Sequence, residues 1–222
     1  MIFKTVQGDC SCSLVAPGSF CNCDQHKRDW SHWIQVTAVC QRWREIALDD
    51  PSLWNTILIE RASTRRVLRC LRLSRGAPLD IVISNYDHVP NVIQKELESR
   101  CAQLRQLHIK NAFDSTDQFV SLNMPAPLLQ HLQLVSCNDG MSLLPMFANS
   151  TPRLQSLFVS GLRYRPQVTF SRVPHIHLSR QYNWTLDDLQ GFLRANTSMN
   201  SRMFHHHGGR SANHSSGHPG PA

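Results

Sequence analysis

The sequence of 222 residues contains no run of 18 or more apolar residues, which excludes a helix that could cross a membrane. Its first ten residues, MIFKTVQGDC, also lack the apolar stretch of a signal peptide. We therefore expect a cytoplasmic or nuclear protein, in which cysteine thiols stay reduced.

The short motifs that mark common catalytic sites are missing as well. G-x-S-x-G, G-x-x-x-x-G-K-[ST] and H-E-x-x-H are all absent. Asp187 and Asp188 are adjacent carboxylates, but they stand at the expected start of a helix, where acidic side chains favour the helix dipole. We expect no enzymatic activity and no cofactor.

Metal-ligating residues are present, but their spacing is unusual for a metal site. Zinc sites typically use C-x₂-C pairs, whereas this chain has C-x-C pairs with His26 nearby. We interpret these cysteines as reduced thiols in an irregular segment, and metal binding by them stays open. The histidines of the Gly/Ser-rich tail have no fixed geometry, so we assign no metal site there. The cysteines are Cys10, Cys12, Cys21 and Cys23, and the histidines are His205, His206, His207, His214 and His218.

The chain is basic, with a net charge of +7, and much of this charge is concentrated in one run. An apolar stripe of Val67, Leu68 and Leu71 indicates that the run is a helix with a solvated arginine face. Such a face could alternatively contact an acidic partner. Because no nucleic-acid-binding motif accompanies it, we do not expect nucleic-acid binding. The arginines are Arg61, Arg65, Arg66, Arg69, Arg72 and Arg75.

The most informative pattern is an internal repeat of the form L-x-x-L-x-φ, where φ is aliphatic. Three copies start at Leu104, Leu129 and Leu154, at a constant step of 25 residues. Earlier steps reach the weaker matches Leu79–Val82 and Trp54–Ile59. A further step forward fails at Ser179, and the nearest strand-like piece is Ile176–Leu178.

This period predicts an α/β fold, because 25 residues hold one short strand, one helix or irregular return, and two turns. The second and third apolar positions of each copy alternate along a strand and point to one face. We therefore expect Leu107, Leu132 and Leu157 to lie side by side on neighbouring parallel strands, with helices outside. The expected helical segments are Pro90–Cys101, Thr116–Leu122, Leu143–Phe147 and one that Thr185 and Asp188 begin, lined by Leu186, Leu189 and Leu193. The pattern resembles a short, irregular leucine-rich-repeat solenoid.

A single amphipathic helix is predicted before the repeats, over residues 31–48. Ser31 can cap it, and Asp49-Asp50-Pro51 ends it. The apolar face is formed by Val36, Val39, Cys40, Trp43, Ala47 and Leu48. Periodicity alone leaves open whether this face packs on the same domain or docks a partner.

The segment Val39–Trp54, with its V-C-x-x-W-R-x-I-A-L followed by P-x-L-W, closely resembles the second half of an F-box. It is most similar to the F-box-like proteins numerous in mushroom-forming fungi, whose bridge into leucine-rich repeats also resembles Arg75–Ile81. The likeness covers residues 33–195, with a specific part of about 20 residues. It implies a substrate-recognition subunit of an SCF-type ubiquitin ligase, which acts in ubiquitin-dependent protein degradation.

The resemblance implies which residues act. The F-box core and the contact with the Skp-family adaptor would be carried by Val39, Cys40, Trp43, Arg44, Ala47, Leu53 and Trp54. From strand alternation alone, exposed His108, Lys110, Gln133 and Phe158 would face an unknown protein substrate. One departure is that residues 1–29 lack the Leu-Pro-x-Glu helix that opens an F-box. Either the reading frame starts upstream, or half of the adaptor-binding surface is missing.

These observations divide the chain into four parts: residues 1–29, irregular or disordered; 30–54, the partial F-box-like helical segment; 55–199, the repeat array; and 200–222, a disordered His/Gly/Ser/Pro tail. The expected function is protein–protein interaction without catalysis. The alternatives are a non-catalytic basic leucine-rich-repeat scaffold, which would meet acidic partners through the arginine helix, and a degenerate F-box product that does not bind the adaptor.

Overall fold

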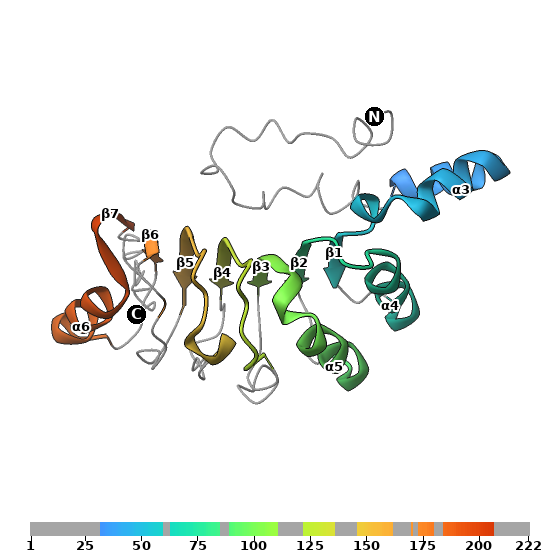
Figure 1. Ribbon diagram of the computed structural model, residues 1–222. Helices are drawn as coiled ribbons and strands as arrows, with labels where there is room; N and C mark the ends of the chain where they lie inside the picture. The colour runs from blue at the N-terminus through green and yellow to red at the C-terminus, as the bar shows by residue number, and fades with distance from the viewer. Residues whose placement is uncertain are drawn as a thin grey trace, which may run out of the picture.

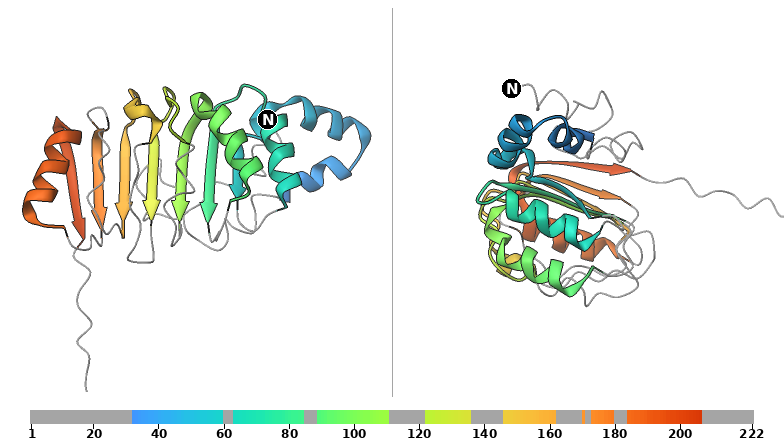
Figure 2. Two further views of the ribbon diagram at one scale, coloured as in Figure 1. Left: turned by 90° about the horizontal axis from the view of Figure 1, so that it is seen from below. Right: turned by 90° about the vertical axis from the view of Figure 1, so that its right-hand side faces the viewer.

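The computed structural model describes residues 32–59, 63–84, 89–110, 122–135, 146–161, 170, 173–179 and 184–206. It is an α/β fold built on one sheet, in which strands β1 to β6 are all parallel and β7 adds to the β6 edge (Figures 1 and 2). The strands lie side by side in chain order. They are β1 (Thr56–Ile59), β2 (Leu79–Ser84), β3 (Leu104–Lys110), β4 (His131–Val135), β5 (Ser156–Ser160), β6 (Val173–Ser179) and β7 (Thr197–His206).

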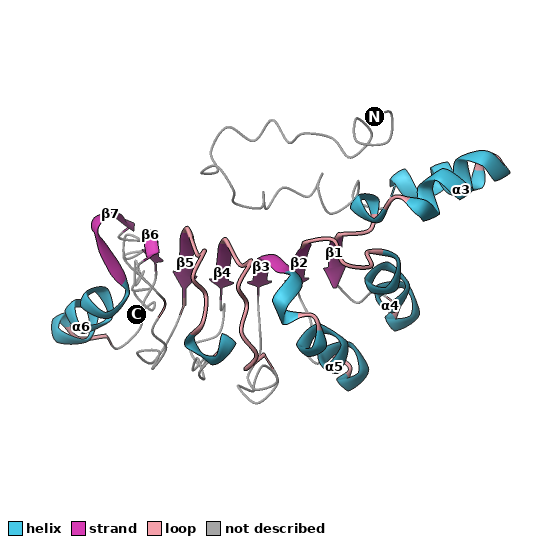
Figure 3. Ribbon diagram, in the orientation of Figure 1, coloured by secondary structure: helices cyan, strands magenta, loops and turns pink. Residues whose placement is uncertain are grey.

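The described α-helices of the sheet region cover one side of the strands, which leaves an opposite side that we call the open face. Helices α4 (Thr64–Leu73), α5 (Asn91–Ser99) and α6 (Leu186–Asn196) all lie on the covered side (Figures 1 and 3). Helix α3 (Gln41–Asp49) lies beyond the β1 end of the sheet. Short 3-10 turns complete the described elements: η1 (His32–Ala38), η2 (Pro51–Leu53), η3 (Cys101–Gln103) and η5 (Phe147–Asn149).

The core consists of aliphatic side chains stacked from strand to strand on the covered side. Leu107 pairs with Leu132, and Leu132 pairs with Leu157, so the predicted side-by-side arrangement of these residues is confirmed. Alternation along a strand places the third apolar residue of each copy on the same face. The two stacked rows are Ile57–Ile81–Leu107–Leu132–Leu157–Ile176 and Ile59–Ile83–Ile109–Leu134–Val159–Leu178, and all of these side chains are buried.

The alignment of Val82 with the second leucine of the repeat was wrong by one residue. Leu79 pairs with Leu104 as expected, but the register shifts between Leu79 and Asp80. Ile81 therefore pairs with Leu107, and Val82 lies on the open face opposite His108. A one-residue shift moves a side chain to the other face of a sheet, which is why the apolar run of β2 did not reveal its register.

Contacts between residues 25 positions apart recur through the sheet region. Side-chain examples include Arg105 with Asp80 and His131 with Ser156. Backbone examples include the N–H of Gln130 donating to the carbonyl of Arg105, and that of Gln155 donating to Gln130. A constant step in the sequence thus corresponds to a constant step from one strand to the next.

Helices α4 and α5 confirm two of the predicted helices and correct their details. On α4, Val67 and Leu71 are buried and Leu68 is half-buried, as the apolar stripe indicated; Cys70 is buried too. On α5, Ile93 and Leu97 face the core, but Val92 is exposed. Val92 precedes Ile93 directly, and adjacent helical positions point about 100° apart, so only one of the two faces the sheet.

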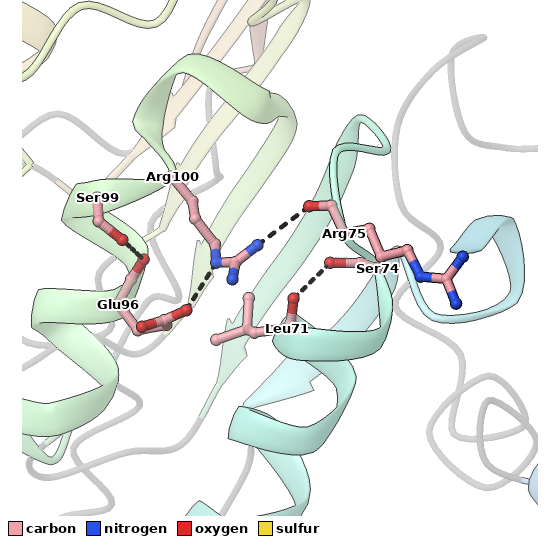
Figure 4. A network of polar contacts seen from close by, with 6 residues as sticks. All are labelled: Leu71, Ser74, Arg75, Glu96, Ser99 and Arg100. Carbon is pink, nitrogen blue, oxygen red and sulfur yellow. Dashed lines mark hydrogen bonds and ion pairs between the residues drawn. The ribbon is translucent and has the colours of Figure 1, made fainter. Parts of the chain in front are cut away.

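Arg100 connects the ends of these two helices (Figure 4). Its Nε donates to Oε1 of Glu96 at 2.8 Å, and its Nη1 donates to the carbonyl of Arg75 at 3.1 Å. Ser74 closes the last turn of α4 by donating from Oγ to the carbonyl of Leu71. The guanidinium therefore satisfies carbonyl and carboxylate groups at the helix ends, where backbone acceptors lack helical partners.

Helix α6 begins with the predicted capping arrangement. Thr185 Oγ1 accepts from the N–H of Asp188 at 3.1 Å, and Asp188 Oδ2 accepts from the N–H of Thr185 at 3.0 Å. The predicted inward face is only partly right, because Leu189 and Leu193 pack against the core while Leu186 is exposed. Phe192 is the fully buried anchor of this helix.

The prediction of one helix over residues 31–48 was wrong. A 3-10 turn, η1, ends at Ala38, and α3 begins at Gln41 after Cys40, whose backbone is extended (φ −155°, ψ 169°). β-Branched residues at 36, 37 and 39 disfavour the α-helix, and Thr37 Oγ1 donates back to the carbonyl of Ile34 at 2.7 Å. The apolar periodicity survives this break, so it could not reveal it.

Several predictions fall outside the described residues, including the irregular segment 1–29, residues 116–121 of the helix expected over 116–122, and residues 143–145 of the helix expected over 143–147. Leu122, the last residue of the first of these helices, is buried but not helical, and Phe147 begins η5. The tail prediction needs correction, because β7 runs to His206 and so enters the segment 200–222 that composition predicted to be disordered. Backbone pairing with the β6 edge forms this strand, and composition does not encode such pairing.

Candidate functional site

The F-box-like residues divide into a buried anchor and an exposed face. Ala47, Leu53 and Trp54 belong to the anchor, which is part of the core of the molecule. The indole Nε1 of Trp54 donates to the carbonyl of Ala47 at 2.7 Å, which ties α3 to the turn before β1. These three residues therefore position α3 against the sheet.

The exposed face of α3 consists of apolar side chains. Val39 is 64% exposed, Trp43 37% and Ile46 46%. Cys40 is exposed beside them, and Arg44 braces the break between η1 and α3 by donating from Nε to the carbonyl of Thr37 at 2.9 Å. We call Val39, Trp43 and Ile46 the α3 apolar face. Exposed apolar groups that lie together in this way are typical of a protein interaction site.

Charged residues border this face. A shallow hollow at the carboxyl end of α3 is lined by Arg42, Glu45, Ile46, Asp49, Asp50 and Pro51. Asp50 is fixed by accepting from the N–H and the hydroxyl of Ser52, at 3.0 and 2.6 Å. An apolar centre with a charged rim is the usual anatomy of a protein–protein interface. Ile46 was not among the predicted site residues, although its place three residues after Trp43 could have indicated it.

A second candidate surface runs across the open face of the sheet. One side chain of each strand from β1 to β6 pairs in register to form what we call the outer row: Leu58, Val82, His108, Gln133, Phe158 and His177. The structure thus brings the predicted His108, Gln133 and Phe158 together on adjacent strands. Lys110 lies two residues beyond His108 on the same face of β3.

The prediction that these four residues are exposed holds only in part. Gln133, Phe158 and Lys110 are half-buried, whereas His108 is 1% exposed. Burial lowers the pKa of His108 to about 3, and the positive charge of Lys110 lowers it too. His108 is therefore neutral at neutral pH, and it supports the outer row from within instead of contacting a partner.

The outer row also contains residues that were not predicted as site residues. The rings of Phe158 and His177 stack with centroids 4.5 Å apart and an interplanar angle of 6°. This stack spans β5 and β6 and presents a flat aromatic surface, a type of contact group enriched at protein interfaces. The alternation of β6 could have indicated His177, since Ile176 and Leu178 are its buried neighbours.

A polar cluster lies next to the outer row, at the starts of β2 to β5. Arg105 binds the carboxylate of Asp80 through two nitrogens, and Nδ1 of His131 lies 2.8 Å from Oγ of Ser156. Burial lowers the pKa of His131, while Asp80 raises it and Arg105 lowers it. The hydrogen bond with Asp80 raises the pKa of Arg105. The cluster orients side chains but contains no nucleophile paired with a base.

The described cysteines are poorly suited to covalent chemistry. Burial raises the pKa of Cys70, and it raises the pKa of Cys101 to about 11. The thiolate is the reactive form, so both side chains are inert at neutral pH. Within the described residues, no three His, Cys, Asp or Glu side chains gather as metal ligands. Cys10, Cys12, Cys21 and Cys23 lie outside those residues, as do the tail histidines from His207 on, and the side chains of His205 and His206 are not described.

Of the helices that the structure describes, none combines the length and the apolar character needed to cross a membrane. Comparison of the chain with protein-family models, with curated proteins and with solved structures finds no match in any of the three.

Proposed function

We propose that this chain is a non-catalytic protein-recognition adaptor of the F-box type. Its α3 apolar face would dock a Skp-family adaptor of an SCF-type ubiquitin ligase, and its sheet would be a short leucine-rich-repeat solenoid that presents a protein substrate. The proposal combines the resemblance of Val39–Trp54 to the second half of an F-box with the geometry of the two surfaces.

The arrangement of the strands supports the repeat part of the proposal. In a stack of equal repeats each unit contacts only its neighbours, and equivalent residues lie one above another. Here the strands follow one another in chain order, and Leu107, Leu132 and Leu157 pair at 25-residue steps. Asp80 with Arg105 and His131 with Ser156 repeat the same step in polar contacts.

The division of the F-box-like segment into two sides supports the adaptor part. Trp54 and Leu53 are used inside the molecule, so they hold the helix in place and cannot contact a partner. The α3 apolar face points away from the core, and this outward orientation of Trp43 is the single observation that carries the proposal. A stable interface buries roughly 800 Å² per partner, more than one short helix face supplies, so we expect weak binding from this face alone.

The open face supports substrate recognition through the outer row. Its half-buried Gln133, Phe158 and His177 combine an amide, an aromatic ring and an imidazole on neighbouring strands. Side chains held on strands present a rigid surface, which lowers the entropy cost of binding. We therefore assign substrate contact to Gln133, Phe158 and His177, and a supporting role to His108.

The experiment that tests the docking proposal is a direct binding measurement between the purified chain and a purified Skp-family adaptor. We expect Val39→Glu and Trp43→Ala each to weaken binding by about tenfold or more, because both remove apolar contacts from the centre of the interface. The matched control is Val92→Glu, which places the same change at a similarly exposed valine (49%) on α5. We expect this control to bind like the unchanged chain.

Two results would overturn the proposal. One is the absence of adaptor binding by the unchanged chain at concentrations of about 100 μM, well above those at which weak interfaces form. The other is an equal loss of binding in Val39→Glu and Val92→Glu, which would show that the α3 apolar face has no special part in docking.

A further inference from the structure

A second charged surface lies on α4, away from both candidate sites. Arg65, Arg69 and Arg72 are exposed and stand at positions i, i+4 and i+7 of this helix. Residues at this spacing share one face, and the three span roughly 10 Å along the helix axis. We call them the arginine stripe.

The arginine stripe differs from the neighbouring arginines because the described structure gives its guanidinium groups no hydrogen bond or ion pair within the chain. Arg75 pairs with Asp49 at 3.4 Å, and Arg100 binds Glu96 and the carbonyl of Arg75 (Figure 4). No side-chain hydrogen bond or ion pair of the described residues engages Arg65, Arg69 or Arg72. Helix α4 itself carries no acidic residue.

Nothing in the packing of α4 requires arginine at these positions. The side of the helix that faces the sheet is formed by Val67, Cys70 and Leu71, all buried. Three like charges on successive turns repel one another and destabilise an isolated helix slightly. A simple solvated face would be served equally well by mixed charges, so the uniform sign is a cost that a binding role explains.

The shape of the basic surface selects the kind of partner. Asp49 lies on the α3 side of the carboxyl end of α4 and Glu96 on the α5 side, so acidic groups border the stripe. The surface is therefore about one helix wide, too narrow for the two phosphate rows of a duplex. No aromatic residue of α4 is available to stack on the bases of a single strand.

From this geometry we infer that the arginine stripe binds an acidic helix of a partner protein, with carboxylates at the same i, i+4, i+7 spacing. Each guanidinium offers two parallel N–H groups that match a carboxylate, which makes arginine better suited than lysine to this contact. Because α4 lies on the covered side of the sheet, such a partner leaves the open face and the α3 apolar face accessible (Figure 1). The inference does not depend on the proposed F-box function.

The test uses the full chain and labelled alanine-based helical peptides in fluorescence anisotropy. One peptide carries glutamates at i, i+4 and i+7 along one face, and a second has the same composition with the glutamates scattered around the helix. Single-stranded and duplex DNA of equal charge are measured alongside. We expect the striped peptide to bind most tightly, and its affinity to fall as salt rises, since the contact is between exposed charges.

The stripe variant is Arg65→Glu with Arg69→Glu and Arg72→Glu, and we expect it to bind the striped peptide at least about tenfold more weakly. Its matched control is Arg42→Glu with Arg153→Glu and Arg194→Glu, three exposed arginines elsewhere. Each triple variant changes the net charge by −6, from +7 to +1. If the glutamate variant fails to fold, the triple glutamine variant makes the same test by removing charge without reversing it.

Three outcomes would overturn the inference. Equal losses in the stripe variant and the control would mean that net charge alone drives binding. Equal binding of the striped and scattered peptides would remove the role of spacing. Tighter binding of DNA than of the striped peptide, abolished by the stripe variant, would assign the stripe to nucleic acid instead.

Discussion

Arg105 holds the carboxylate of Asp80 from the adjacent strand, with Nε donating to Oδ1 at 2.9 Å and Nη2 donating to Oδ2. The Asp80 side chain is 8% exposed, whereas that of Arg105 is 36% exposed. Fork-to-fork pairing of this kind fixes orientation as well as charge. Because Asp80 follows the register shift of β2, the pair also fixes the alignment of β2 with β3.

Replacing only the arginine of this pair should therefore destabilise the fold. We expect Arg105→Met to lower the free energy of unfolding by about 1–3 kcal/mol, since it leaves a buried carboxylate without its cation. The double variant Asp80→Leu with Arg105→Met should recover part of the loss, because it removes both charges. Urea denaturation measures both, and a double variant less stable than Arg105→Met would contradict the explanation.

The buried imidazole of His108 predicts a dependence of stability on pH. Its pKa is about 3 in the folded chain and near 6.5 when unfolded, so the unfolded state takes up a proton first as pH falls. Stability is then fully present above pH 6.5 and is lost as pH falls toward 3. Between pH 7 and pH 5 this linkage removes about 2 kcal/mol.

The His108→Gln variant isolates this effect, because glutamine does not titrate. We expect its free energy of unfolding to change between pH 7 and pH 5 by about 2 kcal/mol less than that of the unchanged chain. Parallel pH dependences in the two proteins would show that other groups, such as His131, are responsible.

Leu132 and Gln133 are adjacent in β4 but face opposite sides of the sheet, so their substitutions should separate stability from binding. Leu132→Ala leaves a cavity in the core and should cost about 2–5 kcal/mol of folding free energy. Gln133→Ala should change stability by less than about 1 kcal/mol, because its side chain is only half-buried. Thermal unfolding of the two variants checks the contrast, and equal losses would place Gln133 in the core.

The hydrogen bond from Trp54 to the carbonyl of Ala47 predicts a role in holding α3 against the sheet. Trp54→Phe keeps an aromatic ring but removes the indole N–H, and should lower the free energy of unfolding by about 1–2 kcal/mol. Hydrogen exchange of the α3 amides should quicken more than that of β3. Uniform quickening throughout the chain would mean that α3 is not tethered by this bond.

The sequence predicted the sheet well because two independent periodicities agreed there. Alternation identified which side chains of β3, β4 and β5 face the core, and the constant step identified which of them are neighbours. Leu107, Leu132 and Leu157 could therefore be paired without any knowledge of the structure. Strand β2 has apolar residues at both alternating positions, so its register stayed ambiguous until the Asp80–Arg105 contact was seen.

Other features could not be read from the sequence, for physical reasons particular to each. The break at Cys40 keeps the helical spacing of apolar residues on either side, so periodicity does not detect it. Alternation gives the face on which His108 lies but not its depth, which depends on neighbouring side chains. The exposure of Val39, Trp43 and Ile46 could not be separated from the burial of Ala47, since all four fit one amphipathic pattern.

The neighbour-only order of the strands has a consequence for how the chain acquires its structure. Every strand finds its partner after a short excursion of the backbone, so the loops that must close are small and their entropy cost is modest. Predominantly local pairing is associated with fast folding, even for a parallel sheet, where distant strands usually slow the search. The chain could therefore assemble progressively during synthesis, each new strand adding to a template that the ribosome has already released.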